Sequence, residues 1–170
     1  MLVLGVDPGS NVTGFGLVEK KNGRLACVHS GFIRPPGKAP FYQRIHYIFR
    51  EIGEVIRCYG PREMAIEDLF YAKNVKSSLK LAHARGAILV AAVQNGVGIF
   101  EYTPLEIKKS VVGYGRASKE QVRAMVQVIL KLKSDFALDT SDALATAICH
   151  LNWARFDKLT TAQNSRRSKK

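Results

Sequence analysis

The sequence predicts an α/β fold in which a mixed five-stranded sheet is flanked by helices. Residues 1–33 hold three mostly apolar runs separated by turns, the pattern of antiparallel strands that follow one another directly. From Phe41 onward, apolar residues recur every three or four positions, which indicates helices. Two further short apolar runs alternate with these helices, and this alternation favours strands that join the sheet in parallel.

Five segments are expected to form the strands. Leu2–Val6 is an apolar run typical of a strand buried on both faces, and the turn residues Pro8–Asn11 separate it from the second strand. An Asn-Gly pair marks the turn into the third strand. The predicted strands are residues 2–6, 12–18, 25–33, 62–70 and 98–103.

The predicted helices have clear boundary signals. Gly60-Pro61 ends the first helix, and capping boxes at Thr103 and Ser118 begin two others. The segment Lys76–Asn95 is apolar almost all round and rich in small residues, so this helix is either central in the core or shared with another subunit. The predicted helices are residues 41–59, 76–95, 104–112, 119–132 and 139–156.

Charge is the unusual feature of the composition. The 170 residues include 26 Lys and Arg against 14 Asp and Glu, a formal charge of +12, which favours a polyanionic partner such as nucleic acid. Residues 157–170 contribute +4, and we expect them to form a disordered basic tail after a single domain of residues 1–156. No apolar run approaches the ~18 residues of a membrane span, and no signal-peptide pattern is present. We therefore expect a cytoplasmic protein with no membrane partner.

Four acids stand where predicted elements begin or end. Asp7 ends the first strand, and Glu67 lies near the end of the fourth. Asp139 and Asp142 open the last helix and share one face, because they are three residues apart. If the first and fourth strands are parallel neighbours, Asp7 and Glu67 meet at one edge of the sheet. Carboxylates ~4 Å apart repel by up to about 4 kcal/mol, so such a cluster binds protons or hard cations. Two Mg²⁺ or Mn²⁺ ions held by these oxygens could promote phosphoryl chemistry.

Each acid also has an ordinary explanation. Asp7 can cap its own turn, or the glycines that follow it can cradle a nucleotide phosphate. Glu67 can be an exposed charge at a strand end, and Asp68 is a rival ligand. The helix dipole favours acids such as Asp139 and Asp142 in any first turn. The combination of four acids with a basic body favours the metal site.

Four blocks of sequence resemble the RuvC-type Holliday junction resolvases over residues 1–155: GVDPGSNVTGFG, IEDLFYAKNVKSSLKLAHARG, SVVGYGRASKEQV and DTSDALA. The resemblance implies an RNase H-like fold and a homodimer. It also implies an Mg²⁺-dependent endonuclease that resolves four-way DNA junctions by paired symmetric nicks in recombination and repair, leaving 5′-phosphate and 3′-hydroxyl ends. A branch-migration complex of the RuvA and RuvB type is the protein partner that the resemblance implies.

The resemblance also assigns the catalytic residues. Asp7, Glu67, Asp139 and Asp142 match the family's metal ligands, which implies two Mg²⁺ ions per site, with Mn²⁺ able to substitute. Thr and Ser replace the two alanines that commonly stand between the last two acids.

The resemblance also implies a set of DNA-binding residues. Lys108 and Lys119 match basic residues near the scissile phosphate, although Lys109 is a rival for the first, and either could be plain helix-surface charge. Phe70 matches an aromatic that contacts bases at the junction centre, where stacking is worth ~1–3 kcal/mol; its alternative is a core position at a strand end. The predicted DNA-binding residues are Phe70, Tyr71, Lys73, Asn74, Lys76, Lys108 and Lys119.

Three other functions fit parts of the sequence. The first block also looks like the phosphate loop of actin-like ATPases and sugar kinases, but those proteins pair two such domains. A non-catalytic module could use the basic surface on structured DNA. A general RNase H-like nuclease would cut RNA–DNA hybrids or single-branch DNA. Cleavage of a four-way junction, compared with a duplex and a hybrid, separates these functions.

Overall fold

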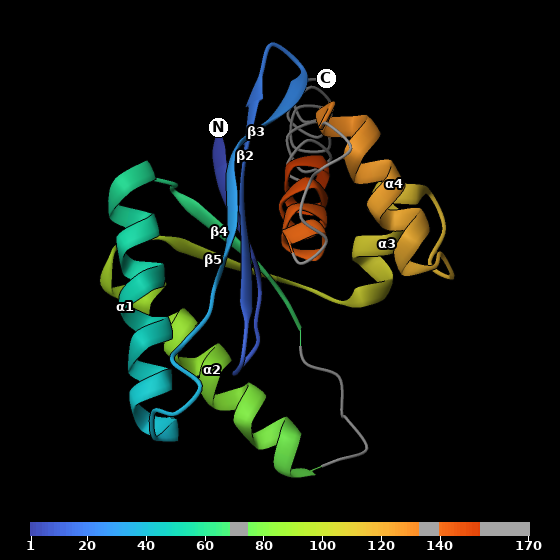
Figure 1. The fold of residues 1–170 in the computed structure, drawn as a ribbon. Coiled ribbons are helices and arrows are strands. Elements are labelled where there is room, and N and C mark those ends of the chain that lie inside the picture. Colours follow the sequence, from blue (N-terminus) through green and yellow to red (C-terminus); the bar gives the residue numbers. More distant parts are fainter. Residues whose placement is uncertain (69–74, 133–139, 154–170) are drawn as a thin grey trace, which may run out of the picture.

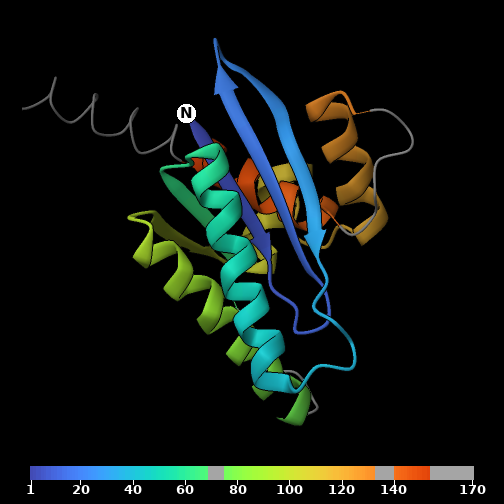
Figure 2. The same ribbon diagram turned by 60° about the vertical axis from the view of Figure 1, so that its left-hand side comes forward.

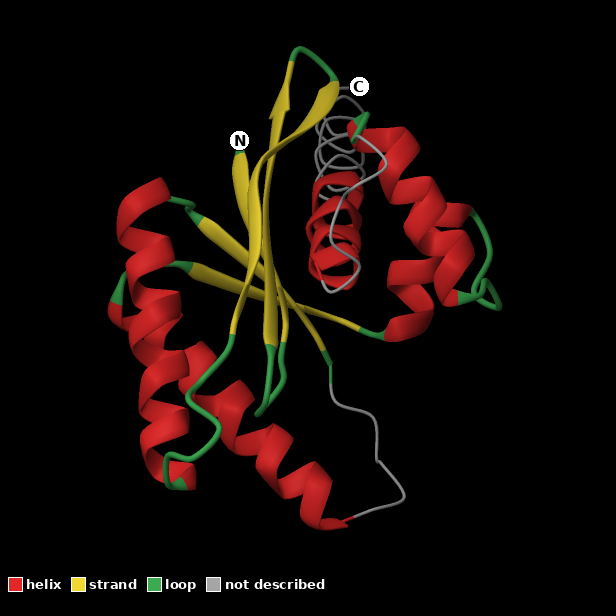
Figure 3. Cartoon of the chain, viewed as in Figure 1, coloured by secondary structure: helices red, strands yellow, loops and turns green. Residues whose placement is uncertain are grey.

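The computed structural model describes residues 1–68, 75–132 and 140–153, and these ranges contain five strands and five helices in the predicted order (Figures 1 and 3). The elements are β1 (Leu2–Asp7), β2 (Thr13–Lys21), β3 (Arg24–Ile33), α1 (Phe41–Tyr59), β4 (Glu63–Glu67), α2 (Val75–Gln94), β5 (Gly98–Tyr102), α3 (Pro104–Val112), α4 (Lys119–Leu130) and a C-terminal helix at residues 141–153.

The strands form one mixed sheet in the order β3-β2-β1-β4-β5. β1 pairs with β2 and β2 with β3 in antiparallel fashion, whereas β1, β4 and β5 run parallel. The first and fourth strands are parallel neighbours, which is the condition under which Asp7 and Glu67 were expected to meet. The carboxyl ends of β1 and β4 therefore lie at the same edge of the sheet.

Helices cover both faces of the sheet. α1 and α2 lie on one face, and α3, α4 and the C-terminal helix lie on the other (Figures 1 and 2). The alternation of side chains along β1 divides the core accordingly: Leu4 and Val6 pack in the cluster with α1 and α2, and Val3 packs in the cluster with the C-terminal helix. Each face thus has its own apolar core.

The C-terminal helix packs unusually close to the strands. Gly5 of β1 and Gly16 of β2 are cross-strand partners, and both lie under this helix. A Cβ atom added to Gly5 would come within 2.0 Å of the Ala143 carbonyl oxygen, and one added to Gly16 would come within 2.6 Å of the Leu144 side chain. The pair of glycines therefore forms a depression that only residues without a side chain can provide.

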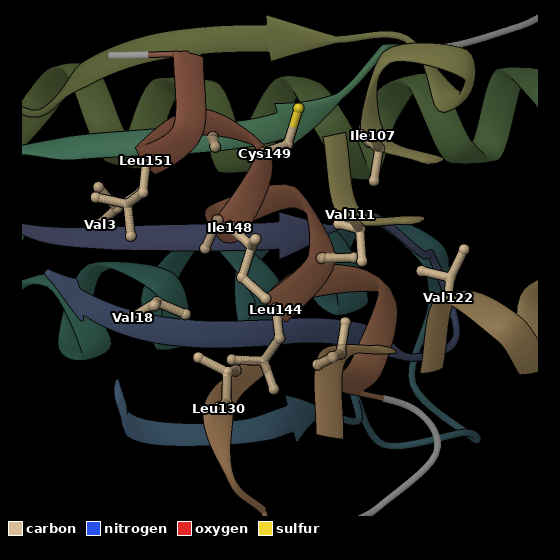
Figure 4. Close-up of a cluster of buried hydrophobic side chains, with 14 of the residues drawn as sticks. Val3, Val18, Ile107, Val111, Val122, Leu130, Leu144, Ile148, Cys149 and Leu151 are labelled. Atoms are coloured by element: carbon tan, nitrogen blue, oxygen red, sulfur yellow. The ribbon is translucent and has the colours of Figure 1, made fainter. Parts of the chain in front are cut away.

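Apolar contacts extend this packing along the helix. Figure 4 shows Leu144, Ile148 and Leu151 beside Val3 and Val18 of the sheet. All five side chains are buried. The helix that carries Asp142 is therefore fixed on the sheet by glycine contacts near its beginning and by aliphatic contacts further on.

The predicted end of the fourth strand is wrong. The fourth strand ends at Glu67 rather than continuing to residue 70; Asp68 has left the strand, although its N–H still donates to the carbonyl of Tyr102 at 2.8 Å. The predicted start and end of the last helix, residues 139 and 154–156, lie outside the described residues. The predicted capping boxes at Thr103 and Ser118 are both present.

α2 is buried on one side only. Ala84, Ile88, Ala91 and Ala92 are buried against the sheet and α1, whereas Leu79, Val90 and Val93 are exposed. The helix is thus not enclosed within the core of a single subunit. No helix in the described part of the chain is long and apolar enough to cross a membrane.

Candidate active site

Three of the predicted acids converge at one edge of the sheet. Asp7 is the last residue of β1, and it points to the same face as Gly5, toward the C-terminal helix. Glu67 ends the neighbouring parallel strand on that face. Asp142 lies in the first turn of the C-terminal helix, next to Ala143, which meets Gly5. The sheet register and the glycine contact together bring the three carboxyl groups to one place.

The pKa values show that these carboxyl groups interact. Burial and, to a smaller extent, the charges of Asp142 and Glu67 together raise the pKa of Asp7 to about 7, and the charge of Lys119 opposes this rise. Burial also raises the pKa of Glu67, again with a contribution from Asp142. The ionised forms of Asp7 and Glu67 are therefore destabilised in the protein alone, and a nearby cation would stabilise them.

Two lysines from different helices contribute positive charge. Lys119, the first residue of α4, places its Nζ 3.3 Å from Oδ2 of Asp142, and this ion pair raises the pKa of the lysine. The charge of Lys108 on α3 partly offsets the rise in the pKa of Glu67, and Lys108 lines a small pocket together with Glu67. Lys109 is exposed and does not line that pocket. The geometry thus favours Lys108 over Lys109 as the lysine of the site.

Asp7 and Asp142 open into a cleft of about 790 Å³. α4 supplies one wall through Lys119, Arg123 and Gln127, while residues from the β1–β2 connection and the start of β2, among them Val12 and Gly14, also line it. The small pocket beside Glu67 shares Lys119 and Asp142 with this cleft. A ligand in the cleft therefore reaches Asp7, Asp142 and Lys119, and Glu67 and Lys108 line the adjoining pocket.

The donor set suits a hard divalent cation. Asp7, Glu67 and Asp142 offer carboxylate oxygens only, the ligands that Mg²⁺ and Mn²⁺ prefer. Among the described residues, no group of three potential ligands is already arranged to hold an ion. The fourth predicted ligand, Asp139, lies outside the described residues. The residues present fit a cation by their chemistry and by the raised pKa values of Asp7 and Glu67.

Several predicted DNA-binding residues also lie outside the described part of the chain: Phe70, Tyr71, Lys73 and Asn74. Lys76 is described; it is exposed in the first turn of α2 and lines neither pocket. The structure therefore brings Lys108 and Lys119 to the acids and leaves Lys76 apart from them.

Two arginines that no motif marks connect distant elements, and one of them, Arg44, holds the loop beside Asp7. Arg44 of α1 donates from Nη2 to the carbonyl of Ser10 at 2.6 Å and to Oδ1 of Asn11 at 2.5 Å, which fixes the loop that follows Asp7. Arg85 of α2 lies 2.8 Å from Oε2 of Glu101 on the neighbouring strand end. No motif marks these residues, because their role depends on contacts between distant elements.

Comparison with known proteins identifies the family. The sequence model described as crossover junction endodeoxyribonuclease RuvC matches residues 3–150. Proteins of that name from Geobacter metallireducens and Magnetococcus marinus are 49% and 46% identical, over 91% and 93% of this chain and 94% and 88% of the relatives. The solved structure of T. thermophilus RuvC in complex with Holliday junction substrate has a TM-score of 0.87 at 33% identity and covers 92% of this chain and 96% of that one.

The mixed sheet and the acids at the ends of its central strands define a nuclease of the RNase H-like class. The chain belongs to the RuvC family of crossover junction endodeoxyribonucleases. The predicted fold class and the predicted enzyme class, a DNA endonuclease, are both confirmed.

Proposed function

We propose that the protein resolves four-way DNA junctions by paired symmetric nicks, using metal-assisted hydrolysis at the acids Asp7, Glu67 and Asp142. The convergence of these acids, in a member of this endonuclease family, carries the proposal. The basic body of the protein suits a DNA substrate, because Lys and Arg side chains displace the counterions of the phosphate backbone. The proposed biological role is recombination and repair.

Asp7, Glu67, Asp139 and Asp142 are the proposed ligands of two Mg²⁺ ions, for which Mn²⁺ can substitute. Bound ions of this kind activate water and stabilise the leaving oxygen in phosphoryl transfer, which leaves a 5′-phosphate and a 3′-hydroxyl. The protein's own contribution is to hold the carboxylates in place. Partial burial keeps bulk water from screening them, and the sheet and the glycine contact limit their movement.

Lys119 and Lys108 have a second role in this proposal. In the protein alone, Lys119 pairs with Asp142, and its side chain is 80% exposed. When DNA binds, the ammonium group of Lys119 can contact a phosphodiester without a large movement of the lysine. Lys119 would then neutralise the scissile phosphate. Lys108 lies beside Glu67 and can do the same from α3. The lysines thus reduce the repulsion between the DNA backbone and the acids.

We assign contact with the junction centre to the segment that follows β4. Phe70 and Tyr71 are the proposed stacking residues, and Lys73, Asn74 and Lys76 are proposed to bind backbone phosphates. Lys76 is exposed at the start of α2, directly after this segment, and is free to reach DNA.

A homodimer is part of the proposal. Leu79, Val90 and Val93 are exposed on α2 and, at intervals of 11 and 3 residues, lie along one side of the helix. An apolar stripe of this kind suits contact with the same helix of a second copy. Two sites related by a two-fold axis can then nick two strands of a two-fold symmetric junction.

Three further elements of the proposal rest on the sequence. A branch-migration complex of the RuvA and RuvB type is the proposed partner. The domain of residues 1–156 carries the activity, and the tail 157–170 adds non-specific charge. The proposed location is the bacterial cytoplasm.

A substrate comparison tests the proposed function. Purified protein is mixed with a synthetic four-way junction, a linear duplex of the same sequence and an RNA–DNA hybrid, each with and without Mg²⁺. We expect paired nicks in the junction alone and only with Mg²⁺. Equal cutting of all three substrates would favour a general nuclease, and binding of the junction without cutting would favour a non-catalytic module.

A further inference from the structure

Arg123 is a cation in the cleft with an unused hydrogen-bonding group. It lies on α4 one turn after Lys119 and lines the same cleft. Its Nε atom is buried and has no hydrogen-bond partner among the described residues. A buried donor on a charged side chain is unfavourable when it has no hydrogen-bond acceptor, and binding of a ligand can change this.

The surroundings of Arg123 do not neutralise it in the described structure. The charged groups that line the cleft from the packed elements are Asp7, Asp142, Lys119 and Glu120. Asp142 is paired with Lys119, and Glu120 hydrogen-bonds Ser118 at the start of the helix. Arg123 forms no ion pair with Asp7, Asp142 or Glu120. The guanidinium therefore remains available to an anion.

Arg123 lies in the middle of a row of three polar side chains that line the cleft along α4. Lys119, Arg123 and Gln127 are spaced by four residues, so they lie along one side of α4 with a rise of ~6 Å from each to the next. The series leads away from Asp142, with the lysine at the acids and the glutamine at the far end. Val12 and Gly14, which line the cleft from the strand side, bring no charge. One wall thus offers a row of donors to a chain of phosphates.

We propose that Arg123 binds a backbone phosphate of the cleaved DNA strand next to the scissile one, and that α4 guides this strand along the cleft past Gln127. The inference rests on the proposed function and adds a substrate-positioning residue to it. Arginine suits this role because its planar guanidinium can hold two oxygens of one phosphate. In this arrangement Lys119 contacts the scissile phosphate, and Arg123 contacts the next phosphate of the same strand.

The salt dependence of junction binding tests this role. Binding is measured in an Asp7→Asn background, so that no strand is cut, at several salt concentrations. We expect Arg123→Gln to weaken binding about tenfold, as for loss of a charged hydrogen bond, and to reduce the slope of log K against log salt by ~0.9. Arg123→Lys retains the slope and recovers part of the affinity.

The matched control is Arg50→Gln. Arg50 lies on α1, on the opposite face of the sheet, and its change removes the same charge from an exposed side chain. We expect this variant to leave affinity and slope unchanged. An equal loss of affinity in both variants would show that Arg123 contributes only to the overall charge of the protein, which would contradict the inference. Unchanged binding by a folded Arg123→Gln variant would also overturn it.

A gain-of-function variant keeps the inference testable if Arg123→Gln unfolds. Gln127→Lys places a new cation at the far end of the series, and we expect tighter junction binding with a slope steeper by ~0.9. No change would contradict the proposed path of the strand. If the unmodified protein cuts the junction but these variants bind it with unchanged affinity and salt dependence, only this inference fails. If the unmodified protein cuts no junction, the proposed function fails as well.

Discussion

The two faces of the sheet are built in different ways. On the face of α1 and α2, large aliphatic side chains such as Leu4, Ile52 and Ile88 fill the space between sheet and helices. On the other face, Gly5 and Gly16 let the backbone of the C-terminal helix approach the strands directly. Bulky side chains can rearrange when one of them changes, but backbone atoms in contact cannot. The second face can therefore hold Asp142 beside Asp7 with little freedom of movement.

The glutamates of β4 show the same division within a single strand. Glu63 and Glu67 point to the same face, four residues apart. Glu63 accepts a hydrogen bond from the buried His150 at 2.8 Å, which fixes the far end of the C-terminal helix. Glu67 lies with other acids, and burial and Asp142 raise its pKa. One glutamate is stabilised by the protein, and the other requires a ligand.

The largest predicted effect comes from the acids of the glycine-lined face. Asp7→Asn should reduce junction cleavage by about a thousandfold or more, because bound metal ions contribute several kcal/mol to such reactions. Junction binding should persist, since the basic surface is unchanged. Gel-shift and single-turnover cleavage assays measure the two properties separately. Loss of binding with normal cleavage of the bound complex would remove Asp7 from the metal site.

Gly5→Ala should have the next largest effect. The new methyl group would lie within 2.0 Å of the Ala143 carbonyl oxygen, so the C-terminal helix must move. We expect a loss of at least ~1–3 kcal/mol in the free energy of unfolding together with a loss of cleavage. Ile88→Val on the opposite face is the control: it should cost ~0.5–1.5 kcal/mol and leave the cleavage rate of the folded protein unchanged. Full activity of Gly5→Ala would show that the close contact is not needed.

A charge on α2 should weaken the dimer. Val93 and Val128 are both exposed valines, 68% and 71% accessible, on helices that cover opposite faces. Val93→Glu should shift sedimentation toward the monomer and uncouple the paired nicks, because burial of a charge at an apolar interface is unfavourable. Val128→Glu should leave the association unchanged. Identical sedimentation of the two variants would place the interface elsewhere.

His150→Ala should have the smallest effect on catalysis. His150 contacts Glu63 at 2.8 Å and the hydroxyl of Tyr102 at 2.7 Å, so its removal leaves two partly buried polar groups without this partner. We expect a loss of ~2 kcal/mol in the free energy of unfolding, measured by urea denaturation. The cleavage rate of the folded fraction should remain normal, since Glu63 lies at the other end of β4 from Glu67. If His150→Ala lowered the cleavage rate as much as Asp7→Asn does, the two ends of β4 would not be independent.

The sequence could predict the parts of the structure that depend on local patterns. The order of strands and helices, the capping boxes at Thr103 and Ser118, and the positions of Asp7 and Glu67 at strand ends all follow from short segments. The early end of β4 was not predicted, because Leu69 and Phe70, which follow Asp68 in the sequence, are apolar residues typical of a strand.

Features that depend on distant contacts could not be predicted. Gly5 reads in the sequence as one small residue in an apolar strand, and only the position of the C-terminal helix shows why no side chain fits there. The same is true of Arg44, which reaches the loop after Asp7 from α1, and of Arg123, whose surroundings come from three separate elements. Their roles arise from tertiary packing rather than from a motif.

Thermal unfolding with and without Mg²⁺ tests the central claim, that the close-packed face gathers acids which require a cation. Burial and the neighbouring acids raise the pKa of Asp7 to about 7, so its contribution to stability falls as the pH rises from its unfolded pKa near ~4 to above 7. At pH 8 without divalent ions, Asp7→Asn should therefore unfold at a higher temperature than the unmodified protein. Mg²⁺ at about 100 times its Kd should stabilise the unmodified protein by ~2.7 kcal/mol and the variant far less. Equal stabilisation of both proteins, or none in either, would contradict the account.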